Sequence, residues 1–210
     1  VVLKNQIKID GDGRAHGTET LTMKGFTFDF SGSASVSIIS AQHGELGSQK
    51  YNYAHNLTIE DVRFIGNPST EVVAIKTTTG STFGLAVKNC QGIHLHSLGQ
   101  LSVAEGFTVE NCMITGGESG INYYGDGEVV ITNFTADVKN YGVRAGQSTG
   151  SVNANATLTI SSSRIMAKFP IWLRGDAPHL VNISAQNSFT VLEGGQEIQN
   201  DAGDDVTIIK

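Results

Sequence analysis

Apolar and polar residues alternate along short segments of this chain, and the segments recur. The clearest copies are LTMKG at 21–25, LTIED at 57–61, LAVKN at 85–89, FTVEN at 107–111, VVITN at 129–133 and LTISS at 158–162. Weaker copies are VNISA at 181–185 and VTIIK at 206–210. Apolar residues two positions apart are typical of a strand with one buried face. Because the copies start 22 to 36 residues apart, they predict a coil of strands that tolerates loop insertions.

Alignment of these copies brings small polar residues into one column. Two positions after the second apolar residue lie Asp61, Asn89, Asn111, Asn133 and Ser162. Stacked about 4.8 Å apart, such side chains are expected to form a buried hydrogen-bonded ladder where the backbone bends. The next column is expected to point inward and consists of Val62, Cys90, Cys112, Phe134 and Ser163. We expect its cysteines to be stacked free thiols, because parallel Cβ vectors suit a disulfide poorly.

Two further strands complete each predicted turn. One begins about 14 residues later, in VVAIK (72–76), GINYYG (120–125), YGVRAG (141–146) and PIWLRG (170–175). A short third strand follows the polar column, as in VRFIG (62–66) and MITGG (113–117). Three strands per turn and an Asn column resemble the single-stranded right-handed parallel β-helix of the pectin-lyase-like superfamily. The resemblance runs from about Gly17 to the C-terminus, and it implies an all-β domain spanning 1–210 with about eight turns, one for each copy of the segment.

Two other architectures fit this pattern less well. A leucine-rich repeat would show a fixed LxxLxLxxN pattern, which is missing. A two-sheet sandwich would show strands at a spacing of about 8–12 residues without columns in register. The β-helix therefore accounts best for the pattern.

Composition narrows the functional classes. Glycine reaches 25 of 210 residues while proline is only 3, which excludes collagen and a proline-rich disordered chain. The formal net charge of −6 argues against nucleic acid as a partner. No apolar run approaches the roughly 18 residues that a membrane helix needs. Since the chain opens on Val1 without an initiator Met, we expect a processed chain or a fragment of a longer protein.

The outward positions of the second strand family carry the candidate chemistry. If Ile121, Val143 and Ile171 point inward, strand alternation points their neighbours outward. The resulting row is Lys76, Asn122, Tyr124, Arg144, Trp172 and Arg174. Aromatic rings stack on sugar faces, and guanidinium groups pair with carboxylates or sulfates. The resemblance implies a polysaccharide groove on this sheet, so we expect a secreted or cell-surface protein that binds an acidic polysaccharide.

A structural interpretation of the same row is equally compatible with the sequence. In that case Arg144 and Arg174 pair with loop acids, and a loop covers Trp172. The protein would then be a non-catalytic adhesin-like or spike-like module. A trimeric tailspike-like homo-oligomer also suits such a module.

The sequence does not decide whether the protein is an enzyme. Tyr124 could be the base of a polysaccharide lyase, with Arg144 or Arg174 neutralising a uronate carboxylate. A glycoside hydrolase needs paired carboxylates, and the row supplies none. The nearest acids, expected just beyond the strand ends, are Asp126, Glu128 and Asp176. The strands of the row carry none of the NTD, DD and RIK signatures of polygalacturonases.

No cofactor or metal site is predicted. His94 and His96 alternate and are expected to share one strand face, but the aligned Gly116 and Gly117 supply no third ligand, which favours a solvated edge. Calcium is compatible with the acidic segment 193–205 through oxygen ligands, yet no calcium-binding motif supports it.

Overall fold

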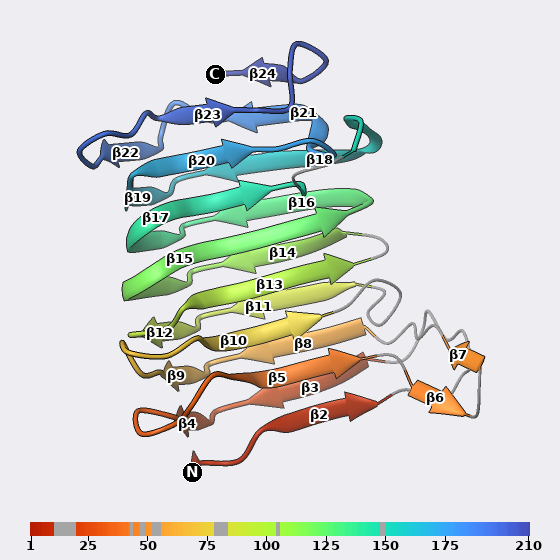
Figure 1. Ribbon diagram of the computed structural model, residues 1–210, viewed down its shortest axis with the longest axis vertical. Coiled ribbons are helices and arrows are strands. Elements are labelled where there is room, and N and C mark those ends of the chain that lie inside the picture. Colours follow the sequence, from red (N-terminus) through yellow and green to blue (C-terminus); the bar gives the residue numbers. More distant parts are fainter. Residues whose placement is uncertain are drawn as a thin grey trace.

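The computed structural model describes residues 1–10, 20–42, 44–46, 49–51, 56–77, 84–103, 106–147 and 150–210. These residues form strands, turns and bends without a helix, which confirms the predicted all-β class. The strands stack along the long axis, with the two ends of the chain at opposite ends of the stack (Figure 1). Within the described residues no helix is long and apolar enough to cross a membrane.

One parallel sheet contains the recurring segments and is called the first sheet here. Its eight strands are β3 (Thr20–Lys24), β8 (Asn56–Glu60), β11 (Leu85–Lys88), β14 (Gly106–Glu110), β16 (Gly127–Thr132), β18 (Asn153–Ser161), β21 (Pro178–Ile183) and β24 (Thr207–Ile209). They pair in chain order from β3 to β24. Each recurring segment therefore occupies the same place on a successive level of the stack.

The second sheet has 14 strands and bends into two walls. Counting the first sheet as the first wall, we call these two parts of the second sheet the second wall and the third wall. The second wall contains β1 (Val2–Leu3), β4 (Thr27–Asp29), β9 (Arg63–Ile65), β12 (Gln91–Ile93), β19 (Arg164–Ala167) and β22 (Ser188–Val191). The third wall contains β2 (Ile7–Asp10), β5 (Val36–Gln42), β10 (Val72–Thr77), β13 (Ser97–Val103), β20 (Phe169–Leu173) and β23 (Ile198–Asn200). Two long strands run through both walls, β15 (Met113–Gly125) and β17 (Thr135–Ala145).

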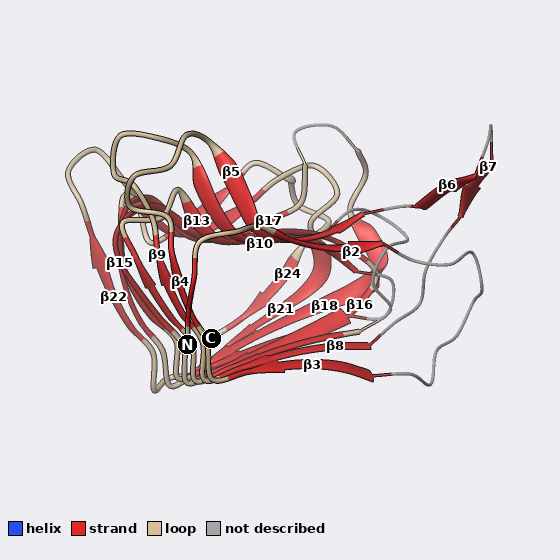
Figure 2. Ribbon diagram, turned by 90° about the horizontal axis from the view of Figure 1, so that it is seen from below, coloured by secondary structure: helices blue, strands red, loops and turns tan. Residues whose placement is uncertain are grey.

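Seen along the stack, the strands form walls around a common interior (Figure 2). The chain visits the first sheet, the second wall and the third wall in the same order on successive levels, for instance through β11, β12 and β13. Apart from these walls, β6 (Gly44–Leu46) and β7 (Gln49–Tyr51) form the antiparallel pair among the described strands. The parallel arrangement is compatible with a β-helix or solenoid.

The interior is filled by the apolar columns that the period-two pattern predicts. On the first sheet, Leu85, Phe107 and Val129 are aligned by the strand register and buried. The second predicted column is also buried, and it consists of Val62, Cys90, Cys112, Phe134 and Ser163. Both cysteines are free, as predicted, and the Cys90 amide donates to Cys112 Sγ at 3.4 Å. Contact with Cys90 together with burial raises the pKa of Cys112, which keeps this thiol protonated.

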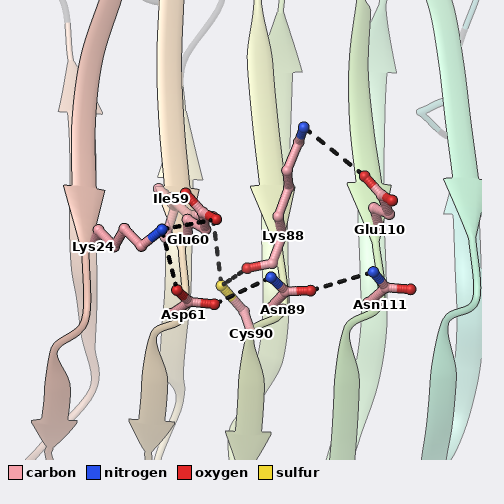
Figure 3. Close-up of polar contacts among 9 residues, drawn as sticks. All are labelled: Lys24, Ile59, Glu60, Asp61, Lys88, Asn89, Cys90, Glu110 and Asn111. Carbon is pink, nitrogen blue, oxygen red and sulfur yellow. Dashed lines mark hydrogen bonds and ion pairs between the residues drawn. The ribbon is translucent and has the colours of Figure 1, made fainter.

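The polar column lies at the corner between the first sheet and the second wall. Asp61, Asn89, Asn111, Asn133 and Ser162 all have φ between 49° and 54°, in the left-handed region that Asn and Asp tolerate best among non-glycine residues. The predicted ladder exists: Asn89 Nδ2 donates to Asp61 Oδ1 at 3.1 Å, and Asn111 Nδ2 donates to Asn89 Oδ1 at 3.2 Å (Figure 3). Asn133 continues it onto Asn111 at 2.8 Å.

One expectation for this ladder was wrong, because its side chains are exposed and not buried. The left-handed backbone turns the amides out of the corner, and the following residue of each turn enters the core instead. Asp61 terminates the ladder, since a carboxylate only accepts hydrogen bonds, and it also forms an ion pair with Lys24 at 3.4 Å (Figure 3).

Candidate functional site

The outer side of the third wall carries a row of side chains in register, which are exposed or half-exposed except for the buried Ser40 and Asn122. From one end of the stack to the other, the aligned positions are Lys8, Ser40, Lys76, Gln100, Asn122, Arg144, Trp172 and Gln199. We call these eight positions the cationic row. They include three cations and no carboxylate, although the protein has a formal net charge of −6.

A hollow of about 350 Å³ lies over the middle of this row. Its lining residues are Lys76, Thr77, Gln100, Asn122, Tyr124, Arg144, Gln147 and Arg174. The structure thus brings together five of the six residues that the sequence analysis selected for substrate binding. The sixth, Trp172, does not line the hollow but contacts both arginines: their Cζ atoms lie 5.9 Å (Arg144) and 4.8 Å (Arg174) from its ring centroid.

The alternation that defined the row is present. Ile121, Val143 and Ile171 are buried in the core, while Arg144 and Trp172 lie half-exposed on the outer side. Tyr123 and Tyr124 are separated in the same way. Tyr123 is enclosed in the core, where burial raises the pKa of its phenol, and Tyr124 faces the hollow.

Arg144 is held by its neighbour in the row. Asn122 is 7% exposed, and its Oδ1 accepts a hydrogen bond from Arg144 Nε at 2.9 Å. The guanidinium also lies over the Tyr141 ring, with Cζ 5.0 Å from the centroid. Since Nε is already used, the terminal Nη groups are the donors left for an anionic ligand.

Trp172 is fixed from two sides. Its Nε1 donates to Asp201 Oδ2 at 2.7 Å, and its ring packs against Tyr141 and Phe169 with centroid distances of 5.8 and 5.5 Å. Asp201 also accepts from Gln199 Nε2. Hydrogen bonds from Gln199 and then from Trp172 lower the pKa of Asp201, so this carboxylate remains charged at neutral pH.

Asp201 interacts with one of the two arginines of the hollow through its charge and not through an ion pair: the charge of Arg174 helps to lower the pKa of Asp201. Among the described residues, Arg144 and Arg174 form no ion pair. Arg174 Nε is buried without a hydrogen-bond partner, and its guanidinium stacks on Trp172. Trp172 is partly covered by the segment that carries Asp201, yet it stays half-exposed.

The candidate catalytic residues do not all converge. Tyr124, Arg144 and Arg174 line the hollow together, whereas Asp126 and Asp176 are not in its lining. Asp126 is exposed and accepts a hydrogen bond from Asn153 Nδ2 at 2.8 Å. Asp176 accepts a hydrogen bond from the backbone N–H of Gln147. Glu128 follows the end of β15, as expected, but it lies within β16 and lines a different hollow on the first sheet.

The expectation for the two histidines was also wrong in part. His94 and His96 do not alternate on one strand, because the chain turns between β12 and β13 and His94 takes a φ of 53°. Both line a third hollow of about 330 Å³. Gly116 leaves room for the His94 imidazole, since a Cβ there would lie 2.7 Å from Nδ1. Over the described ranges, no group of three or more His, Cys, Asp or Glu residues is arranged to hold a metal ion.

Two residues of this face, Gln100 and Tyr141, were not predicted from the sequence. Gln100 could have been found, since it lies 22 residues before Asn122, one minimum turn away, but β13 was not among the predicted strands. Tyr141 could not. Strict alternation from Val143 places it inside, but the wall bends there and Gly142 packs toward Ile165 in its place.

Comparisons of this chain with known protein families, curated proteins and solved structures found no match. The geometry of the described residues is therefore the evidence on its function.

Proposed function

We propose that this chain is a single-stranded right-handed parallel β-helix of the pectin-lyase-like type and that it binds an acidic polysaccharide at the cell surface or outside the cell. About eight turns correspond to the eight strands of the first sheet, with three strands on each full turn. One observation carries the functional proposal. A row with three cations and an aromatic end, without a carboxylate, follows the long axis of an acidic protein.

The dimensions of the row suit a linear polymer. Lys76 and Arg144 are separated by three strand spacings, or about 14 Å. A small anion would use one of these cations, whereas a chain with a charge on successive sugar units can reach both. Trp172 adds an apolar ring to one end of the hollow, and such rings stack on the apolar faces of sugars.

The binding test uses the only tryptophan of the chain as its reporter. Trp172 fluorescence is followed while polygalacturonate, alginate or hyaluronan is added, with neutral dextran as the reference glycan. We expect a saturable change with at least one acidic polymer, weakened by salt because exposed charges are screened. No response to any acidic polymer would overturn the proposal.

Variants then locate the site by calorimetry. Arg144→Ala and Trp172→Ala are both expected to weaken glycan binding. Arg144→Ala should leave the melting temperature nearly unchanged, whereas Trp172→Ala should lower it moderately, because the ring packs against Tyr141 and Phe169. Lys88→Ala is the matched control, since Lys88 is a cation on the outer side of the first sheet. Equal losses of stability in the Arg144 and Trp172 variants would show that these residues support the core and do not form a site.

Cleavage is a second candidate, favoured by the position of Tyr124 beside two arginines in the same hollow. In a lyase reaction, Tyr124 would remove the C5 proton of a uronate, the C4–O bond would break, and the leaving oxygen would take up a proton. Arg144 or Arg174 would stabilise the carboxylate during proton removal. Ultraviolet absorbance of an unsaturated product tests this, and Tyr124→Phe should abolish it. Reducing ends without that absorbance would indicate hydrolysis, and neither signal would leave a binding or structural module.

A further inference from the structure

The hollow over the cationic row differs in charge from the other two hollows. Among the described residues, its charged lining residues are all cations, namely Lys76, Arg144 and Arg174. The hollow of about 330 Å³ contains Glu118, which pairs with Lys139 at 3.4 Å, and the hollow on the first sheet contains Glu128. Three cations are therefore gathered at one place on a chain with a formal net charge of −6.

The two arginines reach this hollow from adjacent levels of the stack. Arg144 lies on β17, and Arg174 follows the last residue of β20, the next strand of the third wall (Figure 1). The backbone N–H of Arg174 donates to the Ala145 carbonyl at 2.9 Å, which keeps the two arginines close together. Both guanidinium groups also lie against the Trp172 ring. One anionic group in the hollow can therefore be contacted by both arginines.

The contacts of the two arginines restrict which donors a ligand meets. Arg144 Nε already donates to Asn122, and Arg174 Nε is enclosed without a partner. Neither guanidinium can therefore offer a ligand its Nε–Nη edge, which is one of the edges that pair in parallel with a planar carboxylate. The Nη groups of two side chains are left, and they approach from different levels. This arrangement favours an anion whose oxygens point in several directions.

A sulfate ester is such an anion, because its three terminal oxygens lie at three corners of a tetrahedron. Two of them can accept hydrogen bonds from the arginines. The third can accept from the neutral donors that line the same hollow, Gln100, Tyr124 and Gln147. A phosphate monoester has the same shape but binds a proton near neutral pH, with a pKa of about 6. The described lining has no carboxylate to accept that proton, whereas a sulfate ester carries none.

The size of the hollow also favours a densely charged ligand. Its volume of about 350 Å³ is near the lower end of the range for ligand sites, which is about 300–1,000 Å³. It therefore encloses only a short stretch of a polysaccharide. A polyuronate carries one charge on each sugar unit, whereas sulfation can place several on the same sugar. A sulfated chain thus matches three cations within a shorter stretch.

We propose that this hollow binds the sulfate groups of a sulfated polysaccharide in preference to the carboxylates of a polyuronate. This preference rests on the proposed function, because it specifies which acidic group the polysaccharide carries. Arg144 and Arg174 share one sulfate through their Nη groups. Lys76, three strand spacings from Arg144, binds a second anionic group of the same chain. Trp172 contacts the apolar face of a sugar beside the first sulfate.

Three dextrans with the same backbone test this preference: neutral dextran, carboxymethyl-dextran and dextran sulfate, the last two with equal numbers of charges per sugar. Trp172 fluorescence and calorimetry measure their affinities at one ionic strength, because salt weakens the binding of every charged polymer. We expect dextran sulfate to bind about tenfold or more tightly than carboxymethyl-dextran, since several charge-assisted hydrogen bonds distinguish the two anions. Neutral dextran should not bind.

The outcomes separate this preference from the proposed function. Equal affinities for the two charged dextrans, or tighter binding of carboxymethyl-dextran, would overturn the preference for sulfate and leave a site for acidic polysaccharides. Phosphorylated dextran that binds as tightly as dextran sulfate would also overturn the choice of sulfate. No binding of any charged dextran or polyuronate would overturn both proposals.

Arginine-to-lysine variants locate the preference, since lysine keeps the charge but not the planar array of donors. Arg144→Lys and Arg174→Lys should each reduce the ratio of the two affinities by about threefold or more. Arg164→Lys is the matched control, because Arg164 is an exposed arginine on the second wall. Melting temperatures verify folding, and the dextran comparison on the original chain depends on no variant. A ratio that stays unchanged in both hollow variants would overturn the assignment of the sulfate to these arginines.

Discussion

The first sheet and the third wall both carry cations on their outer sides, but only on the first sheet are carboxylates aligned with these cations. On the first sheet, the register aligns Lys24, Glu60, Lys88 and Glu110 in one column. Lys24 pairs with Glu60 at 3.1 Å and Lys88 with Glu110 at 3.9 Å (Figure 3). The contact with Glu60 raises the pKa of Lys24. On the third wall, the cationic row has no carboxylate in register with its cations.

This difference shows that the residues aligned with a cation on the adjacent turns determine whether the cation forms an ion pair. A Lys that precedes an acid by one turn forms an ion pair with it, and such an exposed pair contributes little to stability. A cation aligned with amides keeps its charge for a ligand. Asn122 illustrates the second case, because it orients Arg144 without cancelling its charge.

The largest expected effect comes from giving the cationic row the character of the first sheet. Gln100→Glu places a carboxylate in register between Lys76 and Asn122. We expect it to weaken acidic glycan binding by about tenfold or more, because a charge-assisted hydrogen bond contributes about 1.5–3 kcal/mol. Calorimetry measures the affinity, and Thr108→Glu on the first sheet should leave it unchanged. Equal effects of the two variants would show that overall charge matters and not the row.

The next effect concerns the ladder beside the paired charges. Asn111→Ala loses hydrogen bonds to Asn89 and Asn133 and forces alanine into a φ of 53°. We expect the free energy of unfolding, measured by urea denaturation, to fall by about 1–2 kcal/mol. Asn111→Gly separates the two causes, because glycine adopts this φ readily but also lacks the amide. A loss in Asn111→Ala below about 0.5 kcal/mol would contradict a stabilising ladder.

A smaller effect is expected when the pH is lowered, at the hydrogen bond between Asp201 and Trp172. The pKa of Asp201 is lowered in the folded protein, so its stabilising contribution is present above the unfolded value of about 3.9 and is lost as pH falls through the lowered folded value. Trp172 fluorescence should therefore change below about pH 4. In Asp201→Asn this transition should disappear, and its persistence would assign the change to another group.

The smallest effect is expected for the exposed pair on the first sheet. A double-mutant cycle with Lys88→Ala and Glu110→Ala should give a coupling of about 0.5 kcal/mol or less, since the charges are 3.9 Å apart and solvated. Thermal or urea unfolding provides the four stabilities. A coupling above about 1.5 kcal/mol would mean that the two sheet faces differ less than the register indicates.

Much of the fold could be predicted because one period repeats in the sequence. Apolar residues two positions apart, followed by an Asn, predicted the parallel columns, the buried cysteines and a bend of the backbone at the polar column. The same alternation selected Arg144 and Trp172 as outward neighbours, and the register aligns them. Whether the ladder amides face the core or the solvent did not follow, because that depends on the direction in which the corner turns.

The sequence by itself determined which residues share a column, because a strand alternates strictly and each turn returns to the same level. Only the tertiary structure decided what each column touches. The bend near Tyr141 turns its ring toward Trp172, and the approach of residues from successive levels places Asn122 on Arg144 and Asp201 on Trp172. These contacts join residues 22 to 31 positions apart, and their geometry depends on how the walls bend, which no local pattern encodes.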